Sequence, residues 1–348
     1  GGIVDGDPGY VKLCCMSRRR WWSRGAALAV SAAAAAALVI PGSGVTPEPS
    51  SPVRTTASGA ETPVLDVYAL SKYVSLGSSY AAGPAVSRLH TVCQRSADNY
   101  PHQVAAALGM RLSDASCSGA RTVNILRVPQ RPLRMPQISA VTPDTRLVTI
   151  TTGGNDLDYM GRLLAMGCAN SDPRHISPLT ARACARPKPI RPEPVARDYV
   201  AVEQSIAATV GAVRARAPHA LVVIVDYLPL GPVGQRCAGL ALTPAQAIST
   251  RRVYDALVAA TARAAAASDA VLVRASRAGA GHGVCSKSPW LSGFGTGGVS
   301  YHPNAQGKTA VADLVLAALR QPSTVAEFVT LGVLPASGVV GPGVAPSR

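Results

Sequence analysis

Residues 220–225 constrain the fold more than any other segment of this chain. They read Ala-Leu-Val-Val-Ile-Val and contain no polar side chain. An extended segment that is apolar at every position must be covered on both faces, which is typical of a strand inside a parallel sheet. Residues 270–273 form a second apolar run of the same kind. The sequence therefore predicts an α/β fold in which helices cover both sides of a mainly parallel sheet.

Strand-like and helical patterns alternate along residues 64–322, which we interpret as one domain. Further strands are predicted at residues 72–76 and 146–151. Helices are predicted at residues 98–110, with Asp98 as N-cap, at 243–268 and at 306–319, and also where Tyr199, Val202, Ile206, Val210 and Val213 recur at helical spacing. Residues 231–242 and 277–301 are expected to be loops. Sites in such folds lie at the carboxyl ends of the strands.

The N-terminal region has the pattern of an export signal. Arginines at 18–20 and 24 precede fifteen uncharged residues, 26–40, and proline and glycine then break the run. A basic segment before a short apolar one is typical of a secretory signal and is short for a membrane span. We therefore expect an upstream extension and signal-like segment at 1–45, a Pro-rich linker at 46–63, a tail at 323–348, and a secreted or envelope location.

Six cysteines follow the signal-like segment: Cys93, Cys117, Cys168, Cys184, Cys237 and Cys285. An even number in an exported chain indicates disulfides, and six cysteines allow 15 pairings. Sequential pairing is the simplest. Free buried thiols are the alternative, and the spacing is not that of a metal site.

The chain is strongly basic, with a net charge of +15. Such a charge favours attraction to anionic envelope polymers or lipid headgroups, although it could serve solubility alone. Nucleic-acid binding is disfavoured, because the arginines are scattered and aromatic residues are scarce.

Four short motifs occur in order. Gly77-Ser78-Ser79 follows the first strand, then come Cys117-Ser118-Gly119 and Gly153-Gly154-Asn155-Asp156, and His302-Pro303 precedes the last helix. A serine nucleophile needs a base to take its proton and donors for the oxyanion that it creates. Glycine permits close approach to a backbone N–H, and an asparagine amide donates without adding charge.

Together these motifs resemble the SGNH, or GDSL-type, esterase/lipase family. The resemblance implies a flavodoxin-like three-layer α/β/α sandwich with Ser79 as nucleophile and His302 as base. It also implies an oxyanion hole made by the backbone N–H groups of Ser79 and Gly119 and the side chain of Asn155. Exported actinobacterial members, which this chain is similar to, have three disulfides that correspond to Cys93–Cys117, Cys168–Cys184 and Cys237–Cys285.

The chain departs from the family pattern at two positions. Ser78 stands where the family has an aspartate, which affects the support of the turn more than the chemistry. Val299 stands three residues before the histidine, where the family often has the aspartate that orients the imidazole. The resemblance then implies a Ser–His dyad in which the carbonyl of Val299 or Ser300 accepts from the imidazole.

Two groups of residues near the motifs have open roles. Trp290, Leu291 and Phe294 either line the substrate pocket or belong to a loop packed on the core. Asp156 and Asp158 are expected to cap the helix that follows them.

The sequence therefore predicts an exported serine esterase or lipase that cleaves small-molecule or lipid esters through an acyl-enzyme. No metal or organic cofactor is implied, and we expect a monomer. The alternatives are a non-catalytic envelope-binding pseudoenzyme, and a glycan deacetylase or acyltransferase on the same scaffold.

Overall fold

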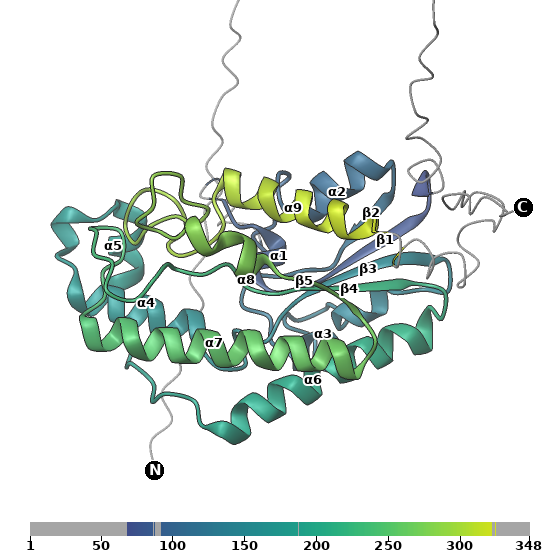
Figure 1. Ribbon diagram of the computed structural model, residues 1–348, viewed down its shortest axis with the longest axis horizontal. Helices are drawn as coiled ribbons and strands as arrows, with labels where there is room; N and C mark the ends of the chain where they lie inside the picture. Colours follow the sequence, from purple (N-terminus) through teal and green to yellow (C-terminus); the bar gives the residue numbers. More distant parts are fainter. Residues whose placement is uncertain (1–67, 86, 88–91, 187, 322–323, 325–348) are drawn as a thin grey trace, which may run out of the picture. The chain divides into compact units, whose positions relative to one another are not determined.

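The computed structural model describes residues 68–321 and 324, apart from 86, 88–91 and 187. Within these residues, five parallel strands form one sheet in the order β2-β1-β3-β4-β5 (Figure 1). The strands are β1 (Lys72–Gly77), β2 (Arg111–Asp114), β3 (Thr145–Thr151), β4 (Leu221–Val225) and β5 (Val271–Val273). This is the flavodoxin-like order, whose switch point lies between β1 and β3. The predicted parallel α/β fold is confirmed.

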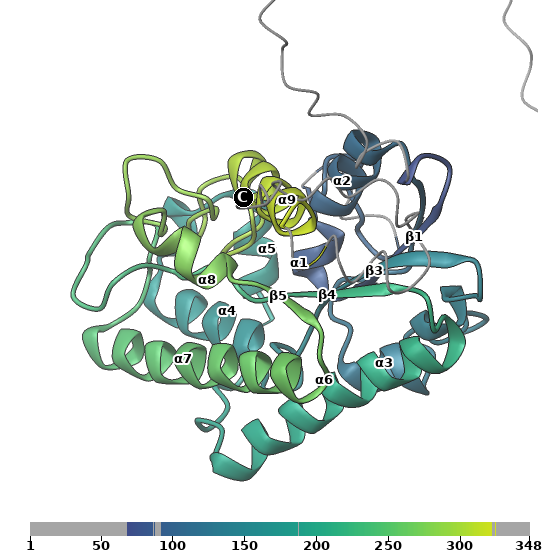
Figure 2. The ribbon, with the colours of Figure 1, turned by 45° about the vertical axis from the view of Figure 1, so that its right-hand side comes forward.

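Helices cover both faces of the sheet, as the three-layer prediction requires. The short α1 (Ser79–Ala82), α2 (Tyr100–Leu108) and α9 (Ala305–Leu319) lie on one face, and α2 packs on α9. On the other face, α3 (Thr122–Leu126) packs on α6 (Ala196–Arg216), and α6 on α7 (Pro244–Ala267) (Figures 1 and 2).

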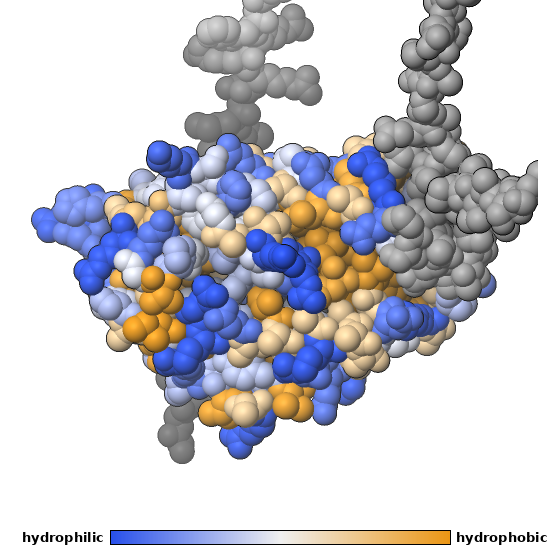
Figure 3. All heavy atoms as spheres, viewed as in Figure 1, coloured by the Kyte–Doolittle hydropathy of each residue, from blue (hydrophilic) through white to orange (hydrophobic). Residues whose placement is uncertain are grey.

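The burial of the strands follows their sequence patterns. All five residues of β4 are buried, which agrees with a strand covered on both faces. The edge strand β5 keeps Val271 and Leu272 half-buried. Figure 3 shows apolar side chains gathered over β5 and the adjoining part of α9. The core thus continues to this open edge of the sheet.

The helix boundaries differ from the predicted ones by a few residues. The helix predicted at 98–110 is α2, and its N-cap is Asn99 instead of Asp98. The Asn99 side chain accepts from the backbone N–H of His102 at 3.0 Å, while Asp98 pairs with Lys308 at 2.9 Å. Proline at 101 suits the first turn because it has no N–H to leave unpaired.

Three disulfides connect cysteines that follow one another in the sequence. Cys93–Cys117 holds the segment after α1, Cys168–Cys184 joins α4 (Tyr159–Asn170) to α5 (Pro178–Cys184), and Cys237–Cys285 joins the two long loops. These are the pairs that the resemblance implies. The loop predicted at 277–301 also contains the end of α8 (Ala275–Ala278) and a 3-10 turn, Gly279–Gly281.

Among the residues described, no helix is long and apolar enough to cross a membrane. The predicted signal-like segment and linker lie outside the described residues, as does the predicted tail except at residue 324. These three assignments stay predictions.

Candidate active site

Ser79 and His302 meet at the carboxyl end of the sheet. Ser79 begins α1 directly after β1, and its hydroxyl oxygen lies 2.8 Å from Nε2 of His302 in the loop before α9. The turn into α1 requires glycine at 77, where φ is +142° and a Cβ would lie 2.3 Å from the Thr151 carbonyl oxygen. The backbone therefore places the turn that carries Ser79 against the end of β3, at the switch point of the sheet.

The imidazole of His302 is oriented by the main chain. Its Nδ1 lies 2.9 Å from the Ser300 carbonyl oxygen, so Nδ1–H donates there and Nε2 is free to accept from Ser79. The Val299 carbonyl instead accepts from the backbone N–H of His302 at 3.1 Å. Burial lowers the pKa of His302 to about 4, and the hydrogen bond to Ser300 opposes this shift without cancelling it. A half-buried, neutral imidazole results.

The residues expected to bind the oxyanion line the same cleft as Ser79 and His302. These are Gly119, after β2, and Asn155, after β3. Gly119 has a left-handed φ of +81°. The Asn155 amide donates to the Ala120 carbonyl at 2.9 Å, and because an amide has two N–H groups, one is left for a substrate oxygen.

Further hydrogen bonds join the turns that carry Gly119 and Asn155. The Arg121 Nε donates to the Asn155 carbonyl at 3.3 Å. The Thr122 hydroxyl donates to the Asp156 carboxylate at 2.6 Å, and the Thr122 N–H donates to the same group. Burial raises the pKa of Asp156, against the lowering effect of these bonds. The two turns are therefore held as one unit.

The expected capping role of the two aspartates is wrong in its details. Asp156 binds the N-terminus of α3 instead of the helix that follows it. Asp158 occupies the N-cap position of α4, but its side chain makes no capping hydrogen bond and lies 3.6 Å from Arg191. Its left-handed backbone, φ 52°, explains this, because N-cap side chains normally reach N2 or N3 from extended backbone.

Tyr227 is a member of the site that the motifs do not indicate. Its hydroxyl lies 3.3 Å from the Ser78 hydroxyl and accepts from the Gly154 N–H at 3.1 Å. It thus connects the turn that carries Ser79 with the turn that carries Asn155, and it contacts Ser78, which replaces the aspartate of the family motif. Burial raises the pKa of Tyr227 to about 12, so it is a neutral phenol. Its position two residues after β4 indicates the carboxyl end of the sheet, but not its contact with Ser78.

The cleft beside Ser79 has a volume of about 510 Å³ and a largely aliphatic wall. Apolar lining side chains are Met160, Leu164, Leu179, Ala183 and Val299. Of the two readings for Trp290, Leu291 and Phe294, the packed loop is correct. Leu291 and Phe294 are buried in the core, and Trp290 stacks on His282 with ring centroids 4.1 Å apart. Most of the named apolar lining residues instead come from α4 and α5, which no motif marks.

Comparison with known proteins gives consistent results. A model of the GDSL-like lipase/acylhydrolase family matches residues 75–310. Lipase 2 of Streptomyces coelicolor is 33% identical over 270 residues, which cover 74% of this chain and 86% of that protein. The crystal structure of an extracellular lipase from Streptomyces rimosus matches with a TM-score of 0.55 at 28% identity, over 71% of this chain and 99% of that one.

A phospholipase A1 structure from Streptomyces albidoflavus has the same fold. It matches with a TM-score of 0.54 at 24% identity and covers 72% of this chain and 100% of its own.

Proposed function

Because the chain belongs to the GDSL-like lipase/acylhydrolase family and is a carboxylic ester hydrolase, we propose that Ser79 is its nucleophile and His302 its general base. The observation that carries the assignment is the 2.8 Å contact between Nε2 of His302 and the Ser79 hydroxyl. The Ser300 carbonyl supports it, because it places the proton of the neutral imidazole on Nδ1.

The proposed reaction has two halves. The Ser79 oxygen attacks the ester carbonyl carbon while its proton moves to Nε2 of His302. The backbone N–H groups of Ser79 and Gly119 and the amide of Asn155 bind the resulting oxyanion. Collapse breaks the carbonyl–alkoxy bond, and Nε2 returns the proton to the leaving alcohol. Water then attacks the acyl-enzyme in the same manner, the carboxylic acid departs, and Ser79 recovers its proton.

The imidazole is neutral here but only weakly basic, because its lowered pKa means a lower affinity for the serine proton. With its pKa lowered to about 4, His302 is neutral at neutral pH and ready to accept a proton. The imidazolium that forms during attack is stabilised by the partial charge of the Ser300 carbonyl, which is weaker than the full charge of a carboxylate. The dyad therefore relies more on the oxyanion donors than a triad does.

The cleft favours esters with an aliphatic acyl group. Its apolar wall from α4 and α5 lines the same cleft as Ser79 and would bury methylene groups. Export is supported by the three disulfides and by the extracellular relative from Streptomyces rimosus. Transfer of the acyl group to an alcohol uses the same residues, so alcohol added to the assay separates acyltransferase from hydrolase. Acetylated glycans would test the deacetylase alternative.

The assignment of Ser79 is tested by labelling with a fluorophosphonate and by ester hydrolysis. Ser79→Ala is expected to abolish labelling and to lower kcat by about 10⁴-fold or more, since loss of the nucleophile removes the covalent route. Ser78→Ala is the matched control. It removes one hydroxyl from the adjacent position and is expected to keep labelling, because the Ser78 hydroxyl faces Tyr227. Labelling of folded Ser79→Ala protein would refute the assignment, and no labelling of the native protein would favour the pseudoenzyme.

A further inference from the structure

The loop between α3 and the 3-10 helix Gln137–Ala140 exposes unusually large apolar side chains. Leu133 is 105% exposed and Met135 73% exposed, and Val128 is half-exposed. Leu133 also has a left-handed φ of 59°, a conformation that leucine rarely adopts. Apolar groups held out from the surface in this way are typical of a contact site. We refer to residues 127–136 as the projecting loop.

Three arginines alternate with these apolar side chains. Arg127, Arg131 and Arg134 are exposed, and within the described residues their guanidinium groups have no ion-pair or hydrogen-bond partner. The loop contains no acidic residue to neutralise them. Several arginines elsewhere are paired, as Arg252 is with Glu193 and Arg263 with Glu203. The loop therefore presents apolar groups together with positive charge that no described residue pairs.

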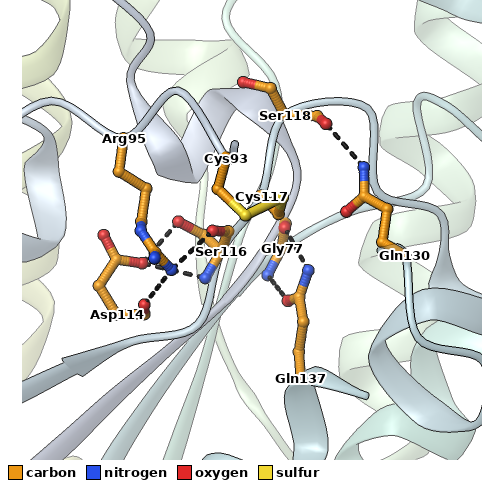
Figure 4. The surroundings of a disulfide bond; sticks show 9 residues. All are labelled: Gly77, Cys93, Arg95, Asp114, Ser116, Cys117, Ser118, Gln130 and Gln137. Carbon is orange, nitrogen blue, oxygen red and sulfur yellow. Dashed lines mark hydrogen bonds between the residues drawn. A yellow bond between two sulfur atoms is a disulfide. The ribbon is translucent and has the colours of Figure 1, made fainter. Parts of the chain in front are cut away.

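The projecting loop is anchored beside the catalytic cleft. The Gln130 side chain donates to the Ser118 carbonyl at 2.7 Å (Figure 4). Ser118 and Gly119 line the cleft. Directly after the loop, the Gln137 side chain accepts from the Gly77 N–H at 2.7 Å and donates to the Gly77 carbonyl at 3.0 Å. The base of the loop is thus joined to the turns that carry Gly119 and Ser79.

We propose that the projecting loop docks the protein on an anionic lipid surface. Leu133 and Met135 would enter the boundary between headgroups and acyl chains, while the arginines bind lipid phosphates. Prolines at 129, 132 and 136 restrict the loop before binding, which lowers the entropy lost on docking. A single-stranded nucleic acid fits less well, because the loop has no aromatic side chain on which bases could stack.

The proposal concerns binding and does not depend on the identity of the nucleophile. It is therefore tested with ether-linked lipids, which contain no carboxylic ester to be cleaved. Co-sedimentation with vesicles of ether-linked phosphatidylglycerol is compared with the neutral counterpart, ether-linked phosphatidylcholine. The native protein is expected to bind the anionic vesicles more tightly. An equal affinity for both vesicles would overturn the role of the arginines, and no binding to either would overturn the proposal.

The charge part of the proposal is tested by Arg131→Gln with Arg134→Gln. Each change is expected to weaken binding to phosphatidylglycerol about fivefold. The matched control is Arg216→Gln with Arg320→Gln, which removes the same charge from the last residue of α6 and from the end of α9 opposite His302. Equal losses in both pairs would show attraction by the net charge of the whole protein, and would overturn a docking role for the loop.

The apolar part is tested by Leu133→Asn, since asparagine tolerates the left-handed backbone. Binding to phosphatidylglycerol is expected to fall about tenfold, while turnover of a soluble short-chain ester is unchanged. Leu70→Asn is the control. Leu70 is also exposed, at 74%, and has a left-handed φ of 64°. It lies before the amino end of β1, whereas Ser79 follows the carboxyl end. If Leu133→Asn has no effect but the arginine pair does, a soluble acidic partner is favoured, and binding to polyglutamate would establish that outcome against the lipid proposal.

Discussion

On one side of the cleft, side chains hold the proposed oxyanion donors in place, whereas on the other side the main chain orients the proposed base, His302. The donor side comprises residues 118–122 and 153–156, whose turns are joined through Asn155, Arg121 and the Thr122–Asp156 pair. The histidine side comprises residues 290–304. There, Ser292 N–H donates to the His302 carbonyl at 2.9 Å and Tyr301 N–H donates to the Ser292 carbonyl at 2.8 Å.

This difference has a consequence for mutational sensitivity. A hydrogen bond made by a side chain can be deleted by one substitution, whereas a main-chain carbonyl is present whatever the residue is. The donor side should therefore respond strongly to single substitutions. The histidine side should respond weakly, except at His302 itself, at residues whose bulk packs the loop, and at Asn304. The Asn304 side chain donates to the Pro289 carbonyl and accepts from the Gly307 N–H.

Among the substitutions that test this contrast, Asn155→Ala is expected to have the largest effect on kcat. Loss of one oxyanion donor is expected to lower kcat by about 10²–10³-fold, because the donor acts on the charge of the transition state. KM should change much less. Kinetics of ester hydrolysis measure both quantities. Asn170→Ala is the control, because Asn170 also donates to a carbonyl, that of Ala241 at 3.0 Å, yet does not line the cleft. A similar loss in both variants would mean that the effect is structural.

A smaller effect is expected from Thr122→Val, which removes the 2.6 Å bond to Asp156 but preserves shape. A hydrogen bond to a charged group contributes about 1.5–3 kcal/mol, so the free energy of unfolding should fall by that order. Looser placement of Gly119 and Asn155 should also lower kcat by about tenfold.

Thr149→Val provides the comparison for this variant. The Thr149 hydroxyl is buried and lies 2.7 Å from the Tyr73 hydroxyl, within β3 and β1. The Thr149→Val substitution should lower the free energy of unfolding without lowering kcat. If Thr122→Val only destabilises as well, the donor side is not positioned by its side-chain bonds.

On the histidine side, the prediction concerns how kcat/KM depends on pH. Since burial lowers the pKa of His302 to about 4, kcat/KM should be half-maximal near pH 4 and fall about tenfold per unit below it. A carboxylate beside Nδ1 would raise this value. A pH profile with a soluble ester measures it, and an inflection at or above 6.5 would contradict orientation by a carbonyl.

The lowered pKa of His302 also makes the free energy of unfolding depend on pH. Between pH 6.5 and about 4 the unfolded chain protonates this imidazole while the folded one does not. The contribution of His302 to the free energy of unfolding is therefore full above 6.5 and declines as pH falls through this window. Urea unfolding at several pH values in native protein and in His302→Gln would isolate it.

Local patterns were sufficient to predict much of the fold and the positions of the four motifs. The apolar run at 220–225 is β4, and the structure brings Ser79, Gly119, Asn155 and His302 to one cleft. Tyr227 could not be identified in the same way, because its role depends on a contact with Ser78, 149 positions away. The lining from α4 and α5 likewise depends on how helices pack, which no short motif encodes.

The smallest expected effect is that of Ser300→Ala. The acceptor for Nδ1 of His302 is the main-chain carbonyl of this residue, which alanine retains. The change does remove the bond from the Gly295 N–H to the Ser300 hydroxyl, 3.2 Å long, so the free energy of unfolding should fall by about 1 kcal/mol. Activity should stay within about twofold of native, and the acidic inflection should not move, because the imidazole keeps its partner.

Val299→Ala serves as the companion to this variant. Its carbonyl, which binds the His302 N–H, is also retained, but its side chain lines the cleft. It should therefore alter the preference for acyl length and leave the inflection in place. If Ser300→Ala lowers kcat as much as Asn155→Ala does, the imidazole is not held by the main chain alone, and the contrast between the two sides of the cleft fails.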